Sequence, residues 1–172
     1  MVEDKVILVD SNDNQIGLMP KLEAHEKGVL HRAFSVFIFN NDGELMLQRR
    51  ALTKYHSPGL WTNTCCSHQR DGETNIISGK RRLNEEMGFN TELFEKTSFI
   101  YKAKFDNGLT EHEFDHVLVG SYNHSPIINP NEVDSWKWMS MENVKKDIKD
   151  HPENYTAWFK IIFEKYYKYI SQ

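Results

Sequence analysis

The residues with the clearest chemical potential are a cysteine and a histidine two positions apart, Cys66 and His68, preceded by a second cysteine, Cys65. Alternate residues of an extended segment share a face, so Cys66 and His68 are expected to point together and Cys65 towards the core. A metal-bound histidine beside a cysteine could tune the acidity of its thiol. The alternative is a buried free cysteine that packs as a small apolar side chain, which suits Cys65 better. A cysteine-protease arrangement lacks a local base and orienting partner.

Two carboxylates, Glu111 and Glu113, would share a face of a strand. They repel each other unless a cation or proton lies between them. With the imidazoles of His25, His31 and His68 they could form a site for Mn²⁺, Zn²⁺ or Fe²⁺. Spacing alone leaves two alternatives open. The carboxylates could lie on a solvated sheet edge, and the histidines could be surface residues or hydrogen-bonded core residues.

Basic residues form a third set that could bind phosphate, since arginine offers a planar fork and lysine a point charge. The set comprises Lys21, Arg49, Arg50, Lys54, Arg81 and Arg82. Glu86 could share a Mg²⁺ ion with such phosphates. The competing interpretation is ordinary helix salt bridging, because Arg81–Glu85 and Arg82–Glu86 are separated by four residues. The aromatic residues Tyr101 and Trp158 are expected in the core, where an aromatic face can also stabilise a cation.

A mixture of strands and helices must position these residues. Apolar and β-branched runs predict strands at 5–9, 15–19, 32–40, 45–48, 99–105, 113–122 and 133–139, with a hairpin turn at 41–44. A helical turn is predicted at 21–26, stopped by Gly28, and helices at 73–87, 141–149 and 156–169, with Ser140 as an N-cap. This order predicts an α+β sandwich rather than a doubly wound parallel sheet.

Composition is typical of a soluble globular protein, with 39% hydrophobic and 27% charged residues in a chain of 172, which predicts one domain over 1–172. The net charge of -4 gives no general attraction to nucleic acid or anionic membrane. The N-terminal segment lacks the apolar core of a signal peptide, and no run reaches the length that spans a bilayer. Adjacent cysteines rarely bridge each other, so a cytoplasmic protein is expected.

Taken together, these motifs resemble those of type 1 isopentenyl-diphosphate Δ-isomerases, members of the Nudix-fold superfamily. The resemblance runs from about Lys5 to about Trp158 and is carried by the segments AHEKGVLHRAFSVFIFN, RRALTKYHSPGLWTNTCCSH, RRLNEEMGF and EHE. It implies a Nudix-type α/β/α sandwich with a mixed sheet. The implied activity is interconversion of isopentenyl and dimethylallyl diphosphate through a tertiary carbocation, in isoprenoid biosynthesis, by a monomer whose partner is that prenyl diphosphate.

The resemblance also implies roles for individual residues. Cys66 and Glu113 would be the catalytic pair, with Tyr101 as an assisting acid near Glu113. The diphosphate would be held by Lys21, Arg50, Lys54 and Arg82, and Trp158 would face the cationic intermediate. One Mn²⁺ or Zn²⁺ would be bound by His25, His31, His68, Glu111 and Glu113. Glu86 would bind a Mg²⁺ that reaches the diphosphate and the carbonyl oxygen of Cys66.

The chain departs from the Nudix hydrolase motif at two positions. Arg82 stands where hydrolases carry a metal-binding glutamate, and Ser67 replaces the first glycine, whereas Glu73 and Arg81 keep their places. The alternatives are a Nudix hydrolase of a nucleoside diphosphate derivative and a non-catalytic metal- and phosphate-binding Nudix module. Arg82 counts against the hydrolase, and the set of Cys66, Tyr101 and Glu113 counts against the module.

Overall fold

The computed structural model describes residues 4–171 and consists of nine strands and four α-helices in those residues. The strands are β1 (Lys5–Val9), β2 (Gln15–Pro20), β3 (His31–Phe39), β4 (Glu44–Arg50), β5 (Trp61–Thr62), β6 (Cys65–Ser67), β7 (Leu93–Lys104), β8 (Thr110–Ser121) and β9 (Val133–Ser140). The helices are α1 (Lys21–Lys27), α2 (Asn75–Met87), α3 (Met141–Asp150) and α4 (Ala157–Ile170), with a 3₁₀ turn at Pro152–Asn154 before α4. In that part of the chain no helix has the length and apolar character needed to cross a membrane.

Strand β3 is the centre of a mixed sheet. It runs parallel to β8 and antiparallel to β6, which lie on its two sides. The predicted hairpin after β3 forms, but β3 and β4 are paired only at Phe39 and Leu45. Strand β4 then turns away and pairs along its whole length with β9. The opening between β3 and β4 is where β6, which carries both cysteines, joins β3.

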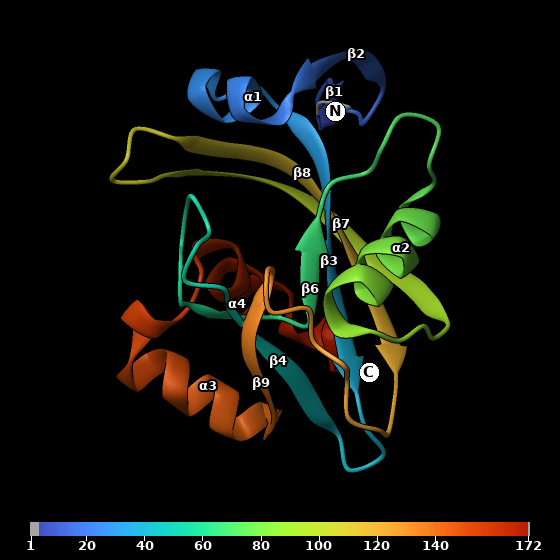
Figure 1. Cartoon of the computed structure of the whole chain (residues 1–172), viewed down its shortest axis with the longest axis vertical. Helices are drawn as coiled ribbons and strands as arrows, with labels where there is room; N and C mark the ends of the chain where they lie inside the picture. Colours follow the sequence, from blue (N-terminus) through green and yellow to red (C-terminus); the bar gives the residue numbers. More distant parts are fainter. Residues whose placement is uncertain (1–3, 172) are drawn as a thin grey trace.

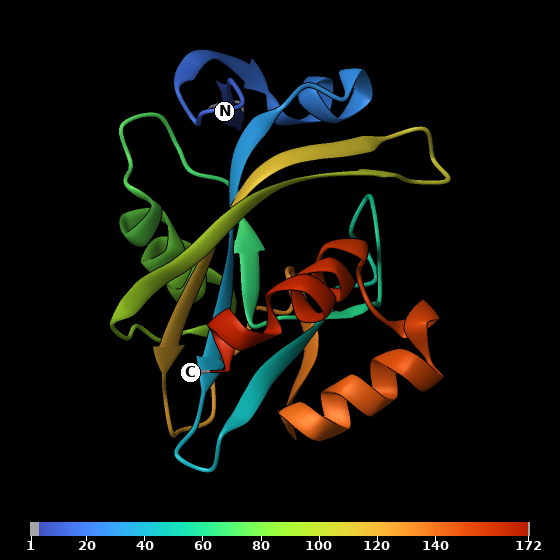
Figure 2. The ribbon, with the colours of Figure 1, turned by 180° about the vertical axis from the view of Figure 1, so that it is seen from behind.

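Helices cover both faces of the sheet, which confirms the predicted α/β/α sandwich (Figures 1 and 2). Alternation along β3 divides its side chains between two cores. Val36 and Ile38 pack in one core with Leu83 of α2, and Phe37 packs in the other with Phe159 of α4. The site described below lies on the α4 side, where Ala33 and Ser35 leave room because their side chains are small.

Most predicted elements are confirmed, with their ends shifted. Helix α2 begins at Asn75 rather than at 73, because the side chain of Thr74 caps it by accepting from the backbone N–H of Ile77. Strand β7 begins at Leu93 rather than at 99. It pairs with β8, and the polar residues 95–98, which are mostly exposed, separate Leu93 and Phe94 from the apolar run that begins at Phe99.

Helix α2 ends at Gly88, which has a left-handed backbone (φ 73°) and would place a Cβ atom 2.5 Å from the carbonyl oxygen of Ile127. We expect Gly88→Ala to lower the free energy of unfolding by about 3 kcal/mol, since it adds a backbone clash to the left-handed strain. Gly43→Ala is the control: φ is 76° there, but nothing lies within 4 Å, so about 1 kcal/mol is expected. Urea unfolding measures both, and equal losses would contradict the role given to Ile127.

Candidate active site

A cavity of about 520 Å³ opens on the α4 side of the sheet and gathers most of the predicted site residues. Its lining includes Lys21, Arg50, Lys54, Cys66, His68, Arg82, Glu86, Tyr101, Glu111, Glu113 and Trp158. These residues come from α1, β4, the loop after β4, β6 and its exit, α2, β7, β8 and α4. The structure thus brings together residues up to 137 positions apart in the sequence, Lys21 and Trp158 (158 − 21).

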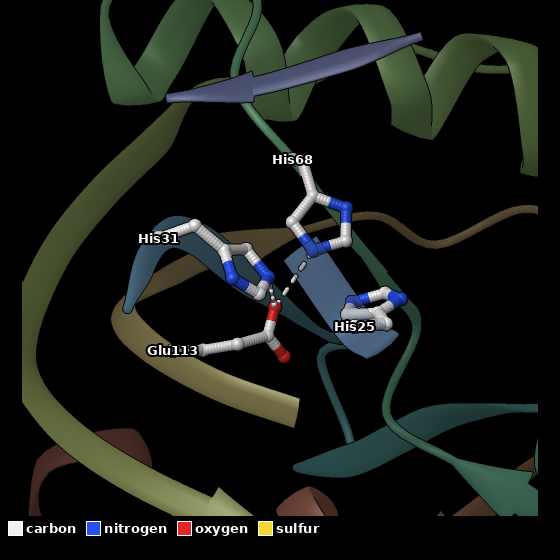
Figure 3. A group of neighbouring side chains, drawn as sticks. All are labelled: His25, His31, His68 and Glu113. Carbon is white, nitrogen blue, oxygen red and sulfur yellow. Dashed lines mark hydrogen bonds and ion pairs between the residues drawn. The ribbon is translucent and has the colours of Figure 1, made fainter. Parts of the chain in front are cut away.

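Three histidines and one glutamate converge at one end of this cavity (Figure 3). One ligand atom each from His25, His31, His68 and Glu113 lies within 4.8 Å of the others. Glu113 Oε2 is 2.7 Å from His68 Nε2 and 3.4 Å from His31 Nε2. This group is called the histidine cluster below.

The histidine cluster fits a divalent metal ion. The Nδ1 atoms of His25 and His31 are already engaged, at 2.8 Å from the hydroxyl of Tyr55 and from the carbonyl oxygen of Val29. Their Nε2 atoms are buried and have no hydrogen-bond partner among residues 4–171. Imidazoles that bind metals in proteins are commonly oriented in this way, through the ring nitrogen that does not face the metal. Burial also lowers the pKa of His25 to about 3 and that of His68 to about 4, so both rings are neutral ligands at neutral pH.

Local structure explains how the cluster is assembled. Gly28, with φ 66°, ends α1 and lets the chain return into β3, so that His25 and His31 approach each other with ring centroids 5.1 Å apart. His31 begins β3 and is the register partner of Glu113 on the parallel strand β8. His68 follows β6 on the other side of β3.

Glu111, the fifth predicted ligand, lies beside the histidine cluster but outside it. The hydroxyl of Tyr101 donates to Glu111 Oε2 at 2.7 Å and also approaches Glu113 Oε1. Burial and the neighbouring Glu113 charge raise the pKa of Glu111 well above its usual value. Burial opposes ionisation of Glu113 as well, but hydrogen bonding with Glu111 and the neighbouring His68 hold its pKa well below the usual value. The pair is therefore one protonated and one ionised carboxyl, joined through a tyrosine.

The two cysteines point to opposite faces of β6, as the alternation predicts. Cys66 lines the cavity, whereas Cys65 is fully buried in the core beneath α2. The Cys65 thiol donates to Glu86 Oε2 at 2.6 Å. Burial raises the pKa of the Cys66 thiol above its usual value, with Arg50 opposing the shift, so the side chain is an uncharged thiol at neutral pH.

Four of the six basic residues, Lys21, Arg50, Lys54 and Arg82, line the cavity, and the end that they form is called its mouth below. Burial lowers the pKa of Lys21, and the charges of Lys54 and Arg82 lower it further. Arg82 lies 3.5 Å from Glu86 and 2.7 Å from Glu85. It therefore forms the expected salt bridges along the helix and also lines the cavity. Arg49 instead pairs with Asp134, and Arg81 with Glu73.

Trp158 forms part of the wall and is 3% exposed. The guanidinium carbon of Arg50 lies 5.3 Å from the centre of its ring. A tryptophan face that already accommodates one cation in a buried setting can stabilise another positive charge in the cavity.

The cavity lining also includes residues that were not among the predicted site residues, and three of these have ionisable side chains: Tyr55, His56 and Asp115. Tyr55 orients His25, and the ring of His56 stacks on Phe105 at 5.0 Å and meets Trp158 edge-on at 5.9 Å. Burial, with Arg50 nearby, lowers the pKa of His56 to about 2, so the ring is neutral. Tyr55 and His56 lie in a loop without periodicity. Asp115 follows Glu111 and Glu113 on the same face of β8, as the alternation predicts for a strand that continues.

The chain is similar to known proteins over most of its length. Residues 29–159 match the model of the NUDIX domain. "Isopentenyl-diphosphate Delta-isomerase 2" of Aromatoleum aromaticum is 51% identical over 91% of this chain and 83% of its own length. "Isopentenyl-diphosphate Delta-isomerase 2" of Photorhabdus laumondii is 50% identical over 94% of this chain and 91% of its own.

Solved structures share the fold at low sequence identity. The MutT protein from Methanosarcina mazei superposes with a TM-score of 0.67 over 81% of this chain and 94% of its own, at 18% identity. The MutT NUDIX hydrolase from Burkholderia pseudomallei gives 0.62 over 79% and 97%, at 19% identity. With its NUDIX fold and relatives of about 50% identity over nearly the whole chain, the protein belongs to the isopentenyl-diphosphate Delta-isomerase family.

Proposed function

We propose that the protein interconverts isopentenyl diphosphate and dimethylallyl diphosphate by adding one proton and removing another. The observation that carries the proposal is a single cavity with a neutral thiol on one strand beside β3, a carboxylate–tyrosine pair on the opposite side of β3, and cations at the mouth. Such a cavity can hold a short hydrocarbon between two proton-transfer groups while its diphosphate is bound outside.

The reaction needs no oxidant and no added atoms other than protons. The electrons of the 3,4 double bond form a bond to a proton at the terminal carbon, and a tertiary cation remains at the third carbon. A base then takes a proton from the second carbon, and the electrons of that bond form the 2,3 double bond. One acid and one base are therefore required, and they exchange roles when the reaction runs backwards.

Cys66 and Glu113 are the proposed acid and base, with Tyr101 assisting Glu113. The two oxygens of Glu113 have separate surroundings: Oε2 faces the imidazoles of His31 and His68, and Oε1 faces the tyrosine hydroxyl. Glu113 can thus bind a metal through one oxygen while its other oxygen takes part in proton transfer with Tyr101. Trp158 would face the cationic carbon, and the buried cavity would keep water from trapping it as an alcohol.

The diphosphate would be bound by Lys21, Arg50, Lys54 and Arg82, all of which line the cavity. A Mg²⁺ ion held by Glu86 would join these cations in neutralising the diphosphate, as is usual for magnesium at phosphates. The same contacts supply binding energy far from the reacting carbons and hold the alkene between Cys66 and Glu113.

The histidine cluster would hold one Mn²⁺ or Zn²⁺ ion, with Glu111 as a further ligand close by. When bound, the metal would supply positive charge that lowers the proton affinity of Glu113. The chain itself orients His25 through Tyr55 and His31 through Val29, which would direct the remaining ring nitrogens towards the ion.

One chain supplies all of the residues proposed for catalysis and binding, so a single domain acting as a monomer would be sufficient for the reaction. The two free cysteines support a reducing compartment such as the cytoplasm. The reaction would make both five-carbon diphosphates available to enzymes that condense them.

Turnover of isopentenyl diphosphate in deuterated water with Mg²⁺ tests the proposal. We expect dimethylallyl diphosphate that carries solvent deuterium, with no phosphate released. Release of phosphate or pyrophosphate would indicate a hydrolase instead. If the substrate stayed unchanged with both metal sites filled, the protein would be a non-catalytic binding module.

A further inference from the structure

One carboxylate, Glu132, lies among the cations at the mouth of the cavity. Its Oε2 atom pairs with the ammonium group of Lys54 and lies 3.4 Å from Nη2 of Arg82. The backbone holds Glu132 in place just before β9, since its N–H donates to the carbonyl of Asn129 and its carbonyl accepts from the N–H of Ala51. The side chain is thus directed at two of the groups proposed to bind the diphosphate.

The surroundings make this contact stronger than a surface ion pair. The side chains of Lys54, Arg82 and Glu132 are only 20%, 18% and 23% exposed. A second cavity of about 490 Å³ adjoins the first, and Lys21, Lys54, Arg82 and Glu132 line it. Although burial opposes ionisation of Glu132, its hydrogen bond from Lys54 lowers its pKa, so the carboxylate is ionised at neutral pH.

A diphosphate that binds at Lys54 and Arg82 meets an anion already there. Either the two cations leave Glu132, or they share their charge between the carboxylate and the phosphate oxygens. Both outcomes reduce the gain from binding, because charge-assisted hydrogen bonds to Glu132 must be given up or weakened. The loss is the same for substrate and product, since both carry the same diphosphate far from the reacting double bond.

We propose that Glu132 is an internal competitor for the diphosphate, which limits how tightly substrate and product are held and so favours product release. The identity of the ligand rests on the proposed function, whereas the competition itself rests on the contacts of Glu132. The residue acts on affinity and does not touch the reacting carbons.

Calorimetric titration with inorganic pyrophosphate and Mg²⁺ tests this without any turnover. Glu132→Gln keeps the shape and an acceptor for Lys54 but removes the charge, so pyrophosphate should bind roughly tenfold more tightly. Glu132→Asp keeps the charge and should stay near the wild-type affinity. Glu85→Gln is the matched control: Glu85 also pairs with Arg82, at 2.7 Å, but lines neither cavity, so less than about a twofold change is expected.

Equal or weaker pyrophosphate binding by Glu132→Gln, in a variant that melts like the wild type, would overturn the proposal and leave Glu132 as a residue that only positions Lys54. A similar gain in pyrophosphate affinity in Glu85→Gln would also overturn it, because removing any nearby negative charge would then tighten binding equally. The isomerase assay is separate. Tightening without isomerisation would refute the proposed function alone, and isomerisation without tightening would refute the competition alone.

Discussion

Cys66→Ala is expected to reduce isomerisation by about 10³-fold or more, because it removes one of the two groups proposed to exchange protons with the hydrocarbon. The KM for isopentenyl diphosphate should change little, since the residues proposed to bind the diphosphate, Lys21, Arg50, Lys54 and Arg82, are left intact. The loss should therefore fall on kcat, which steady-state kinetics separates from KM.

Cys65→Ala is the matched control for that experiment. Cys65 is the neighbour of Cys66 on β6 but is fully buried beneath α2, where it donates a hydrogen bond to Glu86. We expect this variant to lose about 1–2 kcal/mol of stability and to keep activity within about tenfold. If both alanine variants kept wild-type kcat, the thiol would have no part in proton transfer.

Loss of the metal from the histidine cluster is expected to have the second largest effect. Its ligands come from α1, from β3, from the residue after β6 and from β8, so one ion would connect four parts of the fold. A ligand present at about 1,000 times its dissociation constant stabilises the folded state by about 4 kcal/mol. His68→Asn should reduce bound metal to near zero, lower the melting temperature and reduce activity by at least about 10²-fold.

His124→Asn provides the control, because His124 is exposed and lies outside the cluster. Both this variant and the wild type should bind one equivalent of metal when metal content is measured by mass spectrometry after dialysis. Full metal content in His68→Asn, or a melting temperature that chelation does not change, would argue against a metal at these residues.

The sequence was most informative where a residue pattern has a local physical cause. Alternation alone predicted that Cys65 and Cys66 face opposite ways and that Glu111 and Glu113 face the same way, and both expectations are confirmed. Gly28 and Gly88 mark helix ends because they adopt the left-handed backbone that other residues avoid.

What the sequence could not predict depends on contacts between distant segments. The three-residue strand β6 is too short to show a period. It can pair with β3 because β4 pairs with β3 at only one position and leaves that edge of β3 open. Likewise, Tyr55 acquires its position only because the loop that carries it meets α1. The pairing of Glu132 with Lys54 joins residues 78 positions apart, and no spacing rule connects them.

Helix α1 has only seven residues, yet it begins at Lys21 and carries His25 one turn later. Residues four apart lie on the same side of a helix, so one short rigid segment contributes both to the cationic mouth and to the histidine cluster. An ion that holds His25 therefore also restrains Lys21. Occupancy of the two sites should be thermodynamically linked, and by reciprocity each ligand should tighten the other by the same factor.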